Sequence, residues 1–377
     1  MSNEKKRGHG LGKCILIIIV LAIIASCTSP TKTDEFSLNG KVLSKAQAPI
    51  ANARVMVYSF VEISATNSEI KAAYPNHGAS LDAYNRFDHR KFEPILSTLT
   101  DEEGNFSFSG LVKGRYNVVA TKEDIGFSYT LDLDIEDNIT GITINIQAMI
   151  ELPNVIAGDF ILESGRTYFS EIDLLVLPEG NMIVGTDVTL LMAPNTKIEV
   201  HGGLITDQAS SLHISSLGGL YGPGIFVDIG KFDSITIYNQ ESGILRNIYL
   251  DYCILGFRVV GCQSFEIENL FVNAEYQGFV ASGCNSLSIK RSSITGSIES
   301  IRAAAYIINS ESIFVERCHF WGNKKGLQIS ITHSSKVTNN YFNNNVNEDF
   351  SFAQDGEGIV EYNTFRTSNI AIFNNRG

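Results

Sequence analysis

The C-terminal third of the chain repeats itself about every 22 residues. The stretch GFRVVGCQS at 256–264 recurs as GFVASGCNS at 278–286, and IFVERCHFWGN at 313–323 is followed by KVTNNYFNNN at 336–345 and GIVEYNTF at 358–365. A repeat of this length is one small structural unit that buries its apolar face only against its neighbours. The period therefore predicts a stacked, elongated fold, and it names no reaction.

The first 26 residues have the features of a processed leader. Basic residues precede an unbroken apolar run at 14–25, which is too short to span a bilayer. The run ends in Ile24-Ala25-Ser26-Cys27, which resembles the bacterial lipobox. We therefore expect a lipoprotein signal peptide at 1–26, a lipid on Cys27, and a tether at 27–35. An ordinary secretory cleavage site or a short core helix would be the alternative.

The charge of the processed chain narrows its partners. Removing residues 1–26 takes away four of the 29 basic residues and one of the 41 acidic residues, which leaves a net charge of −15. This acidity argues against nucleic acid and against attachment to anionic lipid through a basic patch. We expect the protein to be held in the bacterial cell envelope, at the outer membrane, by lipid inserted from Cys27 without crossing the bilayer.

Four cysteines lie beyond Cys27, and none has the spacing of a zinc site: Cys253, Cys262, Cys284 and Cys318. Cys262 and Cys284 are one repeat apart, so they would lie about 4.8 Å apart on neighbouring strands. We favour a buried stack of reduced thiols, although an oxidising compartment would also allow a disulfide. We expect no metal and no cofactor.

Residues 36–150 show alternating apolar and polar runs separated by turns, as β-strands do. The turn at 101–104 lies between two such runs and suits a hairpin. The pattern Gly40-x-Val42, PIANARVMV at 49–57 and T-x-x-x-G-x-F-x-F-x-G-L-x-x-G-x-Y-x-V from Thr100 resembles the carboxypeptidase regulatory-like (transthyretin-like) β-sandwich. That resemblance implies a noncatalytic spacer or binding accessory.

An insertion at 59–94 departs from this pattern. A loop of that length is either functional or disordered. It contains Asp88 beside His89 and Arg90, which could suggest catalysis, but we predict a solvated loop.

Residues 151–377 follow the short period throughout. The segment from Thr167 to Asp207, with its PEG, APNTKI and GGLI turns, resembles the opening coils of right-handed parallel β-helices of the pectin-lyase-like type. We therefore predict an all-β protein, a β-sandwich followed by a right-handed parallel β-helix of about ten coils. The final coil has no evident cap, so its open edge invites a partner or self-association.

Aligning the repeats converts each position into a column of stacked side chains. Two columns are apolar and should face the core: Leu245, Ile267, Ile289, Val315 and Val337, and Leu250, Val272, Ile294, Phe320 and Phe342. A third contains Cys318, Asn340 and Asn363, which predicts a structural asparagine ladder in the last coils.

An outward column alternates in charge through Arg246, Glu268, Lys290 and Glu316. Regular alternation predicts a stabilising ladder of ion pairs. A polysaccharide lyase would use a basic residue as its base, so Lys290 and Arg291 are the weak catalytic candidates.

Beside the charges, aromatic side chains point outward over several coils with polar neighbours. Such rings stack on sugar rings, and the amides bond hydroxyl groups. The candidate carbohydrate-binding residues are Tyr249, Asp251, Phe271, Asn273, His319, Trp321, Tyr341 and Asn343. The alternative is that a long loop or a partner molecule covers these rings.

The sequence thus favours a cell-surface lipoprotein that binds carbohydrate, or acts as an adhesive or structural module, through its β-helix. A pectate-lyase-like lyase or a glycoside hydrolase acting on an extracellular glycan is the alternative. The paired aspartates and other motifs of the hydrolases have no counterpart, and general acid–base chemistry needs partners within hydrogen-bond reach. A purely structural envelope protein is the third hypothesis.

Overall fold

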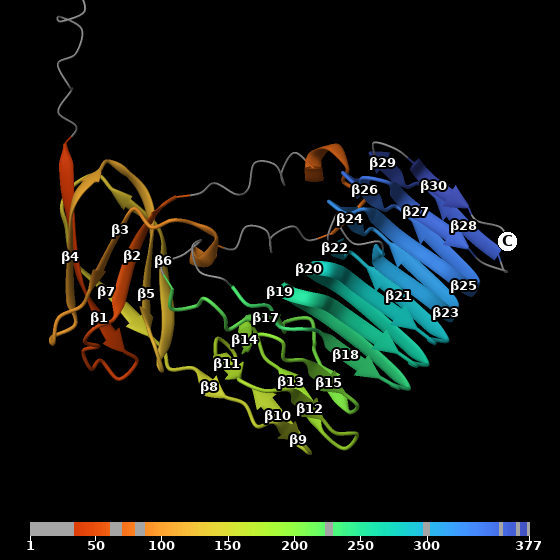
Figure 1. The fold of residues 1–377 in the computed structure, drawn as a ribbon, viewed down its shortest axis with the longest axis horizontal. Helices are drawn as coiled ribbons and strands as arrows, with labels where there is room; N and C mark the ends of the chain where they lie inside the picture. The colour runs from red at the N-terminus through yellow and green to blue at the C-terminus, as the bar shows by residue number, and fades with distance from the viewer. Residues whose placement is uncertain are drawn as a thin grey trace, which may run out of the picture.

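The computed structural model describes residues 34–60, 70–79, 87–222, 229–296, 302–353, 357–366 and 370–374. It confirms an almost entirely β chain with a sandwich followed by a long solenoid (Figure 1). The predicted signal peptide, Cys27 and nearly all of the tether lie outside the described residues, so those expectations stay predictions. Within the described part of the chain, no helix is long and apolar enough to cross a membrane.

The N-terminal domain consists of two sheets that enclose one apolar core. One sheet has the order β4-β1-β7, with β1 at Glu35–Ser44, β4 at Asn105–Val112 and β7 at Ile139–Ile146. The other has the order β3-β2-β5-β6, with β2 at Arg54–Ser59, β3 at Leu96–Leu99, β5 at Gly114–Lys122 and β6 at Gly126–Ile135. Leu38, Val55 and Val118 are fully buried between the two sheets.

The turn at 101–104 exists, but it does not make a hairpin. The Asp101 carboxylate accepts hydrogen bonds from the backbone nitrogens of Glu103 and Asn105, and Gly104 adopts a φ of 76°. The strands on either side, β3 and β4, belong to different sheets. The turn therefore carries the chain from one layer of the sandwich to the other, which alternation along each strand cannot reveal.

The C-terminal domain is a β-solenoid of about nine turns. Its strands stack in three rows, each paired in parallel with the next coil. Row A runs through β8 (Ile150–Glu151), β11 (Thr167–Ser170), β14 (Val188–Met192), β17 (Leu212–Ser216), the middle of β19 (Ser242–Val260) and of β20 (Ser264–Ser282), β22 (Ser293–Thr295), β24 (His319–Trp321), β26 (Tyr341–Asn343) and β29 (Thr364–Arg366).

Rows B and C complete each coil. Row B contains β9 (Val155–Ile156), β12 (Leu174–Val176), β15 (Ile198–Val200), β18 (Ile235–Tyr238), β27 (Glu348–Ala353) and β30 (Ile370–Asn374). Row C contains β10 (Asp159–Leu162), β13 (Asn181–Val184), β16 (Gly203–Ile205), β21 (Ser286–Lys290) and β28 (Glu357–Glu361). Four long strands bend at the corners and contribute segments to both row B and row C: β19, β20, β23 (Ala303–Glu316) and β25 (Lys325–Thr338).

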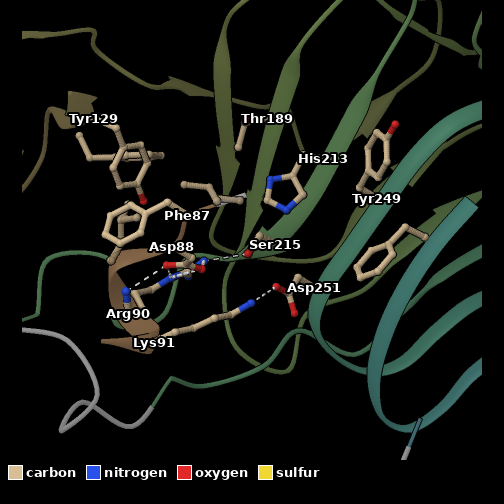
Figure 2. A pocket seen from close by; sticks show the side chains of 14 residues that line it. Phe87, Asp88, Arg90, Lys91, Tyr129, Thr189, His213, Ser215, Tyr249 and Asp251 are labelled. Carbon is tan, nitrogen blue, oxygen red and sulfur yellow. Dashed lines mark hydrogen bonds and ion pairs between the residues drawn. The ribbon is translucent and has the colours of Figure 1, made fainter. Parts of the chain in front are cut away.

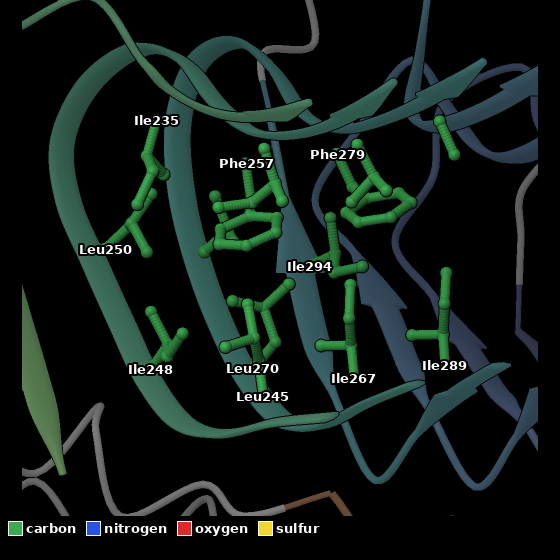
Figure 3. Close-up of a cluster of buried hydrophobic side chains, with 14 of the residues drawn as sticks. Ile235, Leu245, Ile248, Leu250, Phe257, Ile267, Leu270, Phe279, Ile289 and Ile294 are labelled. Carbon is green, nitrogen blue, oxygen red and sulfur yellow. The ribbon is translucent and has the colours of Figure 1, made fainter. Parts of the chain in front are cut away.

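Both predicted core columns are confirmed. Successive members pair in register from coil to coil, and every one of the ten side chains is at most 2% exposed. Figure 3 shows Leu245, Ile267 and Ile289 as one stripe and Leu250 and Ile294 in another. Alternation within each strand, repeated at every coil, therefore predicts the solenoid interior.

The asparagine ladder is also confirmed, and a second pair of stacked asparagines lies at another corner of the coils. Asn340 Oδ1 accepts from the Cys318 nitrogen at 2.8 Å, and Asn363 Oδ1 accepts from the nitrogen and the Nδ2 of Asn340. One corner further on, Asn323 donates through Nδ2 to Asn345 at 3.1 Å. These amides satisfy backbone groups that the turns leave buried.

The four cysteines beyond Cys27 are buried and unbridged. Cys262 and Cys284 lie in the predicted stack, in the arrangement that we favoured over a disulfide. The adjacent thiol of Cys284 lowers the pKa of Cys262 below its usual range.

One corner column holds its residues in the left-handed backbone region. Gly261, Gly283 and Asn309 occupy it with φ values of 68°, 67° and 51°, and Ile331 follows with a φ of 53°. Glycine and asparagine tolerate this conformation, whereas a β-branched side chain is strained there. The Ile331 side chain is 59% exposed, so packing does not compensate for the strain.

Replacing Ile331 with asparagine is therefore expected to raise the free energy of unfolding by about 1 kcal/mol. Urea unfolding followed by circular dichroism would measure the change. Ile244→Asn is the matched control, because Ile244 is 48% exposed and has no positive φ. An equal gain in both variants would show that exposed hydrophobicity, and not backbone strain, is responsible.

Candidate functional site

Two excursions from the regular fold meet between the sandwich and the solenoid. One is the end of the sandwich insertion, where the 3₁₀ helix η2 spans His89–Lys91. The other follows β17, where the coil takes 36 residues from Ile214 to its partner Leu250 instead of about 22. Figure 2 shows Arg90 and Lys91 of η2 extending toward Ser215 and Asp251 of the solenoid.

Arg90 joins the insertion to the β-helix through the two terminal nitrogens of its guanidinium. Its Nη1 donates to the carbonyl oxygens of Ser216 at 2.6 Å and Gly218 at 3.2 Å, and its Nη2 donates to Ser215 Oγ at 2.9 Å. Asp88 accepts from Nε and from Nη2 on the opposite side. The guanidinium also lies 4.4 Å from the ring centroid of Tyr252.

The Asp88–Arg90 pair is buried, with side-chain exposures of 14% and 5%. Burial alone would raise the pKa of Asp88, but the charge and hydrogen bonds of Arg90 hold that pKa well below its usual range. Both groups are therefore ionised, and each supplies the partner that a buried charge requires.

His89 adds a neutral contact to the same junction. Its Nε2 lies 2.9 Å from the Leu220 carbonyl oxygen, and its Nδ1 lies 2.9 Å from the Tyr129 hydroxyl. Because a carbonyl can only accept, Nε2 carries the proton and Nδ1 accepts from the tyrosine. Burial lowers the pKa of His89, which keeps the ring neutral.

The prediction of a solvated loop at Asp88-His89-Arg90 is therefore wrong. The tripeptide is polar, but its groups are satisfied by carbonyls and hydroxyls of the other domain, more than 120 residues away in sequence. It joins the two domains.

A cavity of about 350 Å³ lies beside this junction, between the two domains. Outward columns of row A form its solenoid wall: Thr189, His213, Tyr249 and Phe271 pair in register in one, and Leu191 and Ser215 pair in the next. Figure 2 shows Thr189, His213, Ser215, Tyr249 and Asp251 on the solenoid strands, across from Phe87, Asp88 and Tyr129 of the sandwich. The remaining lining residues are Phe87, Asp88, Arg90, Lys91, Phe127, Tyr129 and Leu220.

The cavity combines aromatic walls with a polar rim. Lys91 Nζ lies 2.8 Å from Asp251 Oδ2 and spans the gap between the domains. Asp251 also accepts from Asn273 Nδ2 at 2.9 Å. Rings and aliphatic side chains thus provide flat apolar surface, and a small number of fixed polar groups border it, as in sites for small organic molecules.

The eight predicted carbohydrate-binding residues do not form one open groove. Tyr249, Asp251 and Phe271 line the cavity, and the exposed Asn273 supports Asp251. His319 and Tyr341 are only 3% and 1% exposed, because Tyr74 and His77 of the insertion stack on Tyr341 and His77 also lies against His319. Trp321 and Asn343 are partly buried beside them. The column and its register are as predicted, and the sandwich insertion covers part of it.

The charged column is in register from Arg246 through Glu268 and Lys290 to Glu316, as predicted. Arg246 pairs with Glu268 at 3.1 Å, and Lys290 pairs with Glu266 at 2.7 Å. Arg291 also pairs with Glu268. The two weak catalytic candidates, Lys290 and Arg291, thus belong to an ion-pair network, and neither lines the interdomain cavity.

Sequence reasoning missed the sandwich side of the cavity, namely Phe87, Lys91, Phe127 and Tyr129. It also missed the solenoid loop that contains Leu220. Two length signals were present: the insertion at 59–94 and the coil that is 12 and 14 residues longer than the coils before and after it. Neither length indicates that the two excursions meet each other.

Two family models match separate parts of the chain. Residues 36–148 match the NOMO third transthyretin-like domain, and residues 233–377 match the right handed beta helix region. A search of curated protein sequences returns no match.

Solved structures resemble the chain only distantly. A protein from Pseudomonas aeruginosa, described as a "putative carbohydrate binding protein", is 17% identical over 31% of this chain and 92% of its own, with a TM-score of 0.17. Tailspike protein 2 of bacteriophage CBA120 is 11% identical in two structures, with TM-scores of 0.27 and 0.31. Those comparisons cover 94% and 95% of this chain but only 53% and 58% of the tailspike chains.

The order of the two matched regions agrees with the two domains of the structure, although the solenoid begins before the second matched region, at β8. The chain therefore consists of a transthyretin-like β-sandwich followed by a right-handed β-helix.

Proposed function

We propose that the protein binds carbohydrate in the cavity between the β-sandwich and the β-helix. The observation that supports this proposal is the combination of aromatic rings from both domains with a fixed polar rim. Tyr249 and Phe271 stand on the β-helix wall, and Phe87 and Tyr129 stand on the sandwich wall. Sugar rings stack their apolar faces on such rings while polar groups bond the hydroxyls.

The size and charge of the cavity indicate the kind of sugar. Its 350 Å³ lies near the lower end of the roughly 300–1,000 Å³ that small-molecule sites occupy. The cavity therefore suits one or two rings, such as the end of a chain. Its two carboxylates and two cations are already paired as Asp88–Arg90 and Lys91–Asp251, so a neutral sugar fits better than a polyanion.

The expected lipid on Cys27 would place this cavity at the cell surface, where extracellular glycans are available. In this proposal the sandwich is more than a spacer, because its insertion supplies one wall of the binding site. We therefore propose a cell-surface, lipid-anchored carbohydrate-binding protein whose site exists only where its two domains meet.

Replacing Tyr249 with alanine is expected to weaken retention on an immobilised neutral polysaccharide by roughly 10- to 100-fold, the worth of one buried aromatic ring. Asp251→Asn should also weaken it, because the rim loses its charged acceptor and the ion pair with Lys91. Affinity electrophoresis against a panel of neutral and acidic polysaccharides, with cleavage assayed in parallel, provides the measurement.

Tyr276→Ala is the matched control, since Tyr276 is a 50% exposed tyrosine on the same long strand, β20, and does not line the cavity. It should bind as the unmodified protein does. Undiminished retention by the Tyr249 variant would exclude the cavity as the binding site.

A further inference from the structure

Residues 70–79 of the sandwich insertion lie across the β-helix, next to β24 and β26 (Figure 1). The Tyr74 ring stacks on Tyr341, with centroids 4.2 Å apart and planes 20° apart. His77 lies 6.0 Å from the Tyr341 centroid and 5.9 Å from that of His319. These contacts reduce the exposure of His319 and Tyr341 to a few per cent.

The covered rings belong to the same outward column as the cavity. Tyr249 and Phe271 are followed in register by Ser293, His319 and Tyr341. His319 and Tyr341 themselves stack at 5.1 Å with planes 21° apart. His319 and Tyr341 thus present one aromatic surface. Tyr74 stacks on it face to face, in the orientation that a sugar ring would adopt.

The cover fits this surface incompletely. Within the described residues, neither ring nitrogen of His319 has a hydrogen-bond partner, and Nε2 of His77 has none either. His319 is 3% exposed, so its nitrogens have lost water without gaining a replacement. Leaving buried polar atoms unpaired weakens a contact, whereas a sugar hydroxyl can donate to one ring nitrogen of His319 and accept from the other, and it can accept from Nε2 of His77, whose Nδ1 already accepts from the Ala79 nitrogen.

We propose that His319 and Tyr341 form a second ring-binding surface, and that residues 70–79 and a sugar ring compete for it. This inference rests on the proposed function, because it extends the same ligand class along the same column. The insertion would then have two roles: its η2 end builds the cavity permanently, and its Tyr74 end occupies the neighbouring surface until a longer glycan displaces it.

Burial of the two imidazoles, His77 and His319, makes the cover sensitive to acid. The covered rings have four cationic neighbours, Lys71, Arg291, Arg317 and Arg366. Two of these are paired with carboxylates, Arg291 with Glu268 and Arg317 with Glu316. The tyrosines Tyr74 and Tyr341 are the other titratable groups beside the rings. Burial, followed by the proximity of His77, lowers the pKa of His319 to about 3. Burial, followed by Lys71, also lowers the pKa of His77.

The sign of the pH effect follows from these shifts. An uncovered imidazole returns toward its ordinary pKa of 6.5, so the open form binds more protons than the covered form. The cover is therefore fully stable above pH 6.5 and loses stability as pH falls below it. Between pH 6.5 and about 3, each pH unit should favour opening up to about tenfold through His319 alone.

Trp321 offers a direct measurement, because it is the single tryptophan of the chain and stacks on His319 with centroids 6.1 Å apart. Acrylamide quenching of its fluorescence should increase at least twofold in a Tyr74→Ala/His77→Ala variant. Asn76→Ala, at an exposed position of the same segment, is the control and should leave quenching unchanged. Unchanged quenching in the double variant would overturn the proposal.

Acidification from pH 7 to 4.5 should raise the quenching of the unmodified protein, with far-UV circular dichroism confirming that the β-helix stays folded. A His77→Gln/His319→Gln variant has no imidazole in this contact, so its quenching should not depend on pH in this range. A pH dependence equal to that of the unmodified protein would overturn the assignment to these two histidines.

Retention on the polysaccharide separates this inference from the proposed function. The Tyr74→Ala/His77→Ala variant should bind several-fold more tightly, and adding Tyr341→Ala should remove that gain. If Tyr249→Ala abolishes retention but the double variant gains no affinity, the result supports binding in the cavity and contradicts the second surface. If Tyr249→Ala leaves retention unchanged while the double variant gains affinity through Tyr341, the result contradicts binding in the cavity and supports the second surface.

Discussion

Replacing Arg90 with alanine is expected to destabilise the docking of the two domains by about 3–5 kcal/mol, because it leaves Asp88 as an unpaired buried carboxylate. The substitution also removes the hydrogen bonds to Ser215, Ser216 and Gly218 of the β-helix. Small-angle X-ray scattering should show an increased radius of gyration. Urea unfolding should show the sandwich and the β-helix separating into two transitions.

Two further variants isolate the cause of this effect. Lys91→Ala removes the neighbouring interdomain pair, whose lysine is 42% exposed, and exposed pairs contribute only about 0–1 kcal/mol. Asp88→Leu combined with Arg90→Met removes both buried charges and should recover part of the loss. If Lys91→Ala were as damaging as Arg90→Ala, the number of contacts and not the buried charge would determine docking.

Replacing Phe342 with alanine is expected to cost about 3–5 kcal/mol, as for other fully buried aromatic residues. Phe342 is 0% exposed and lies between Phe320 at 5.1 Å and Phe365 at 4.9 Å. Because each coil contacts only its neighbours, the loss weakens one interface and not the whole solenoid. The C-terminal coils should therefore unfold at lower urea concentration than the rest, and Trp321 fluorescence in the adjacent coil should report the early transition.

Phe365→Ala is the matched control for this prediction. Phe365 stacks on Phe342 from the side opposite Phe320, and it is only partly buried in the last coil. Its removal should cost less than half as much, and it should not uncouple any further coil. Equal losses for the two substitutions would contradict a nearest-neighbour description of the β-helix.

The regular part of the fold was predictable from sequence because it depends on short-range patterns. Leu245, Ile267 and Ile289 could be placed in one core column since they recur at the period of the coil and alternate with outward residues. The same counting placed Asn340 and Asn363 in a ladder and Arg246, Glu268 and Lys290 in a charged column. Each of these positions follows from the coil length and the two-residue period of a strand.

For the candidate binding residues, the sequence predicted the column in which they lie but not whether they are accessible. The outward column of Tyr249, Phe271, His319 and Tyr341 follows from the repeat, but the sequence left open whether a loop covered it. The structure resolves this alternative by placing Tyr74 on Tyr341 and leaving a cavity beside Tyr249. Similarly, the polarity of Asp88, His89 and Arg90 suggested solvent, since a buried charge cannot be recognised before its partners are known.

The sequence by itself thus determined the solenoid, its core, its ladders and the presence of a sandwich with a long insertion. The tertiary structure alone decided where that insertion lies, which rings it covers and where the interdomain cavity forms. The physical reason is distance along the chain. Repeats constrain residues about 22 positions apart, whereas the junction joins His89 to Leu220 and Lys91 to Asp251 across 131 and 160 positions, a contact set by surface complementarity and not by any local pattern.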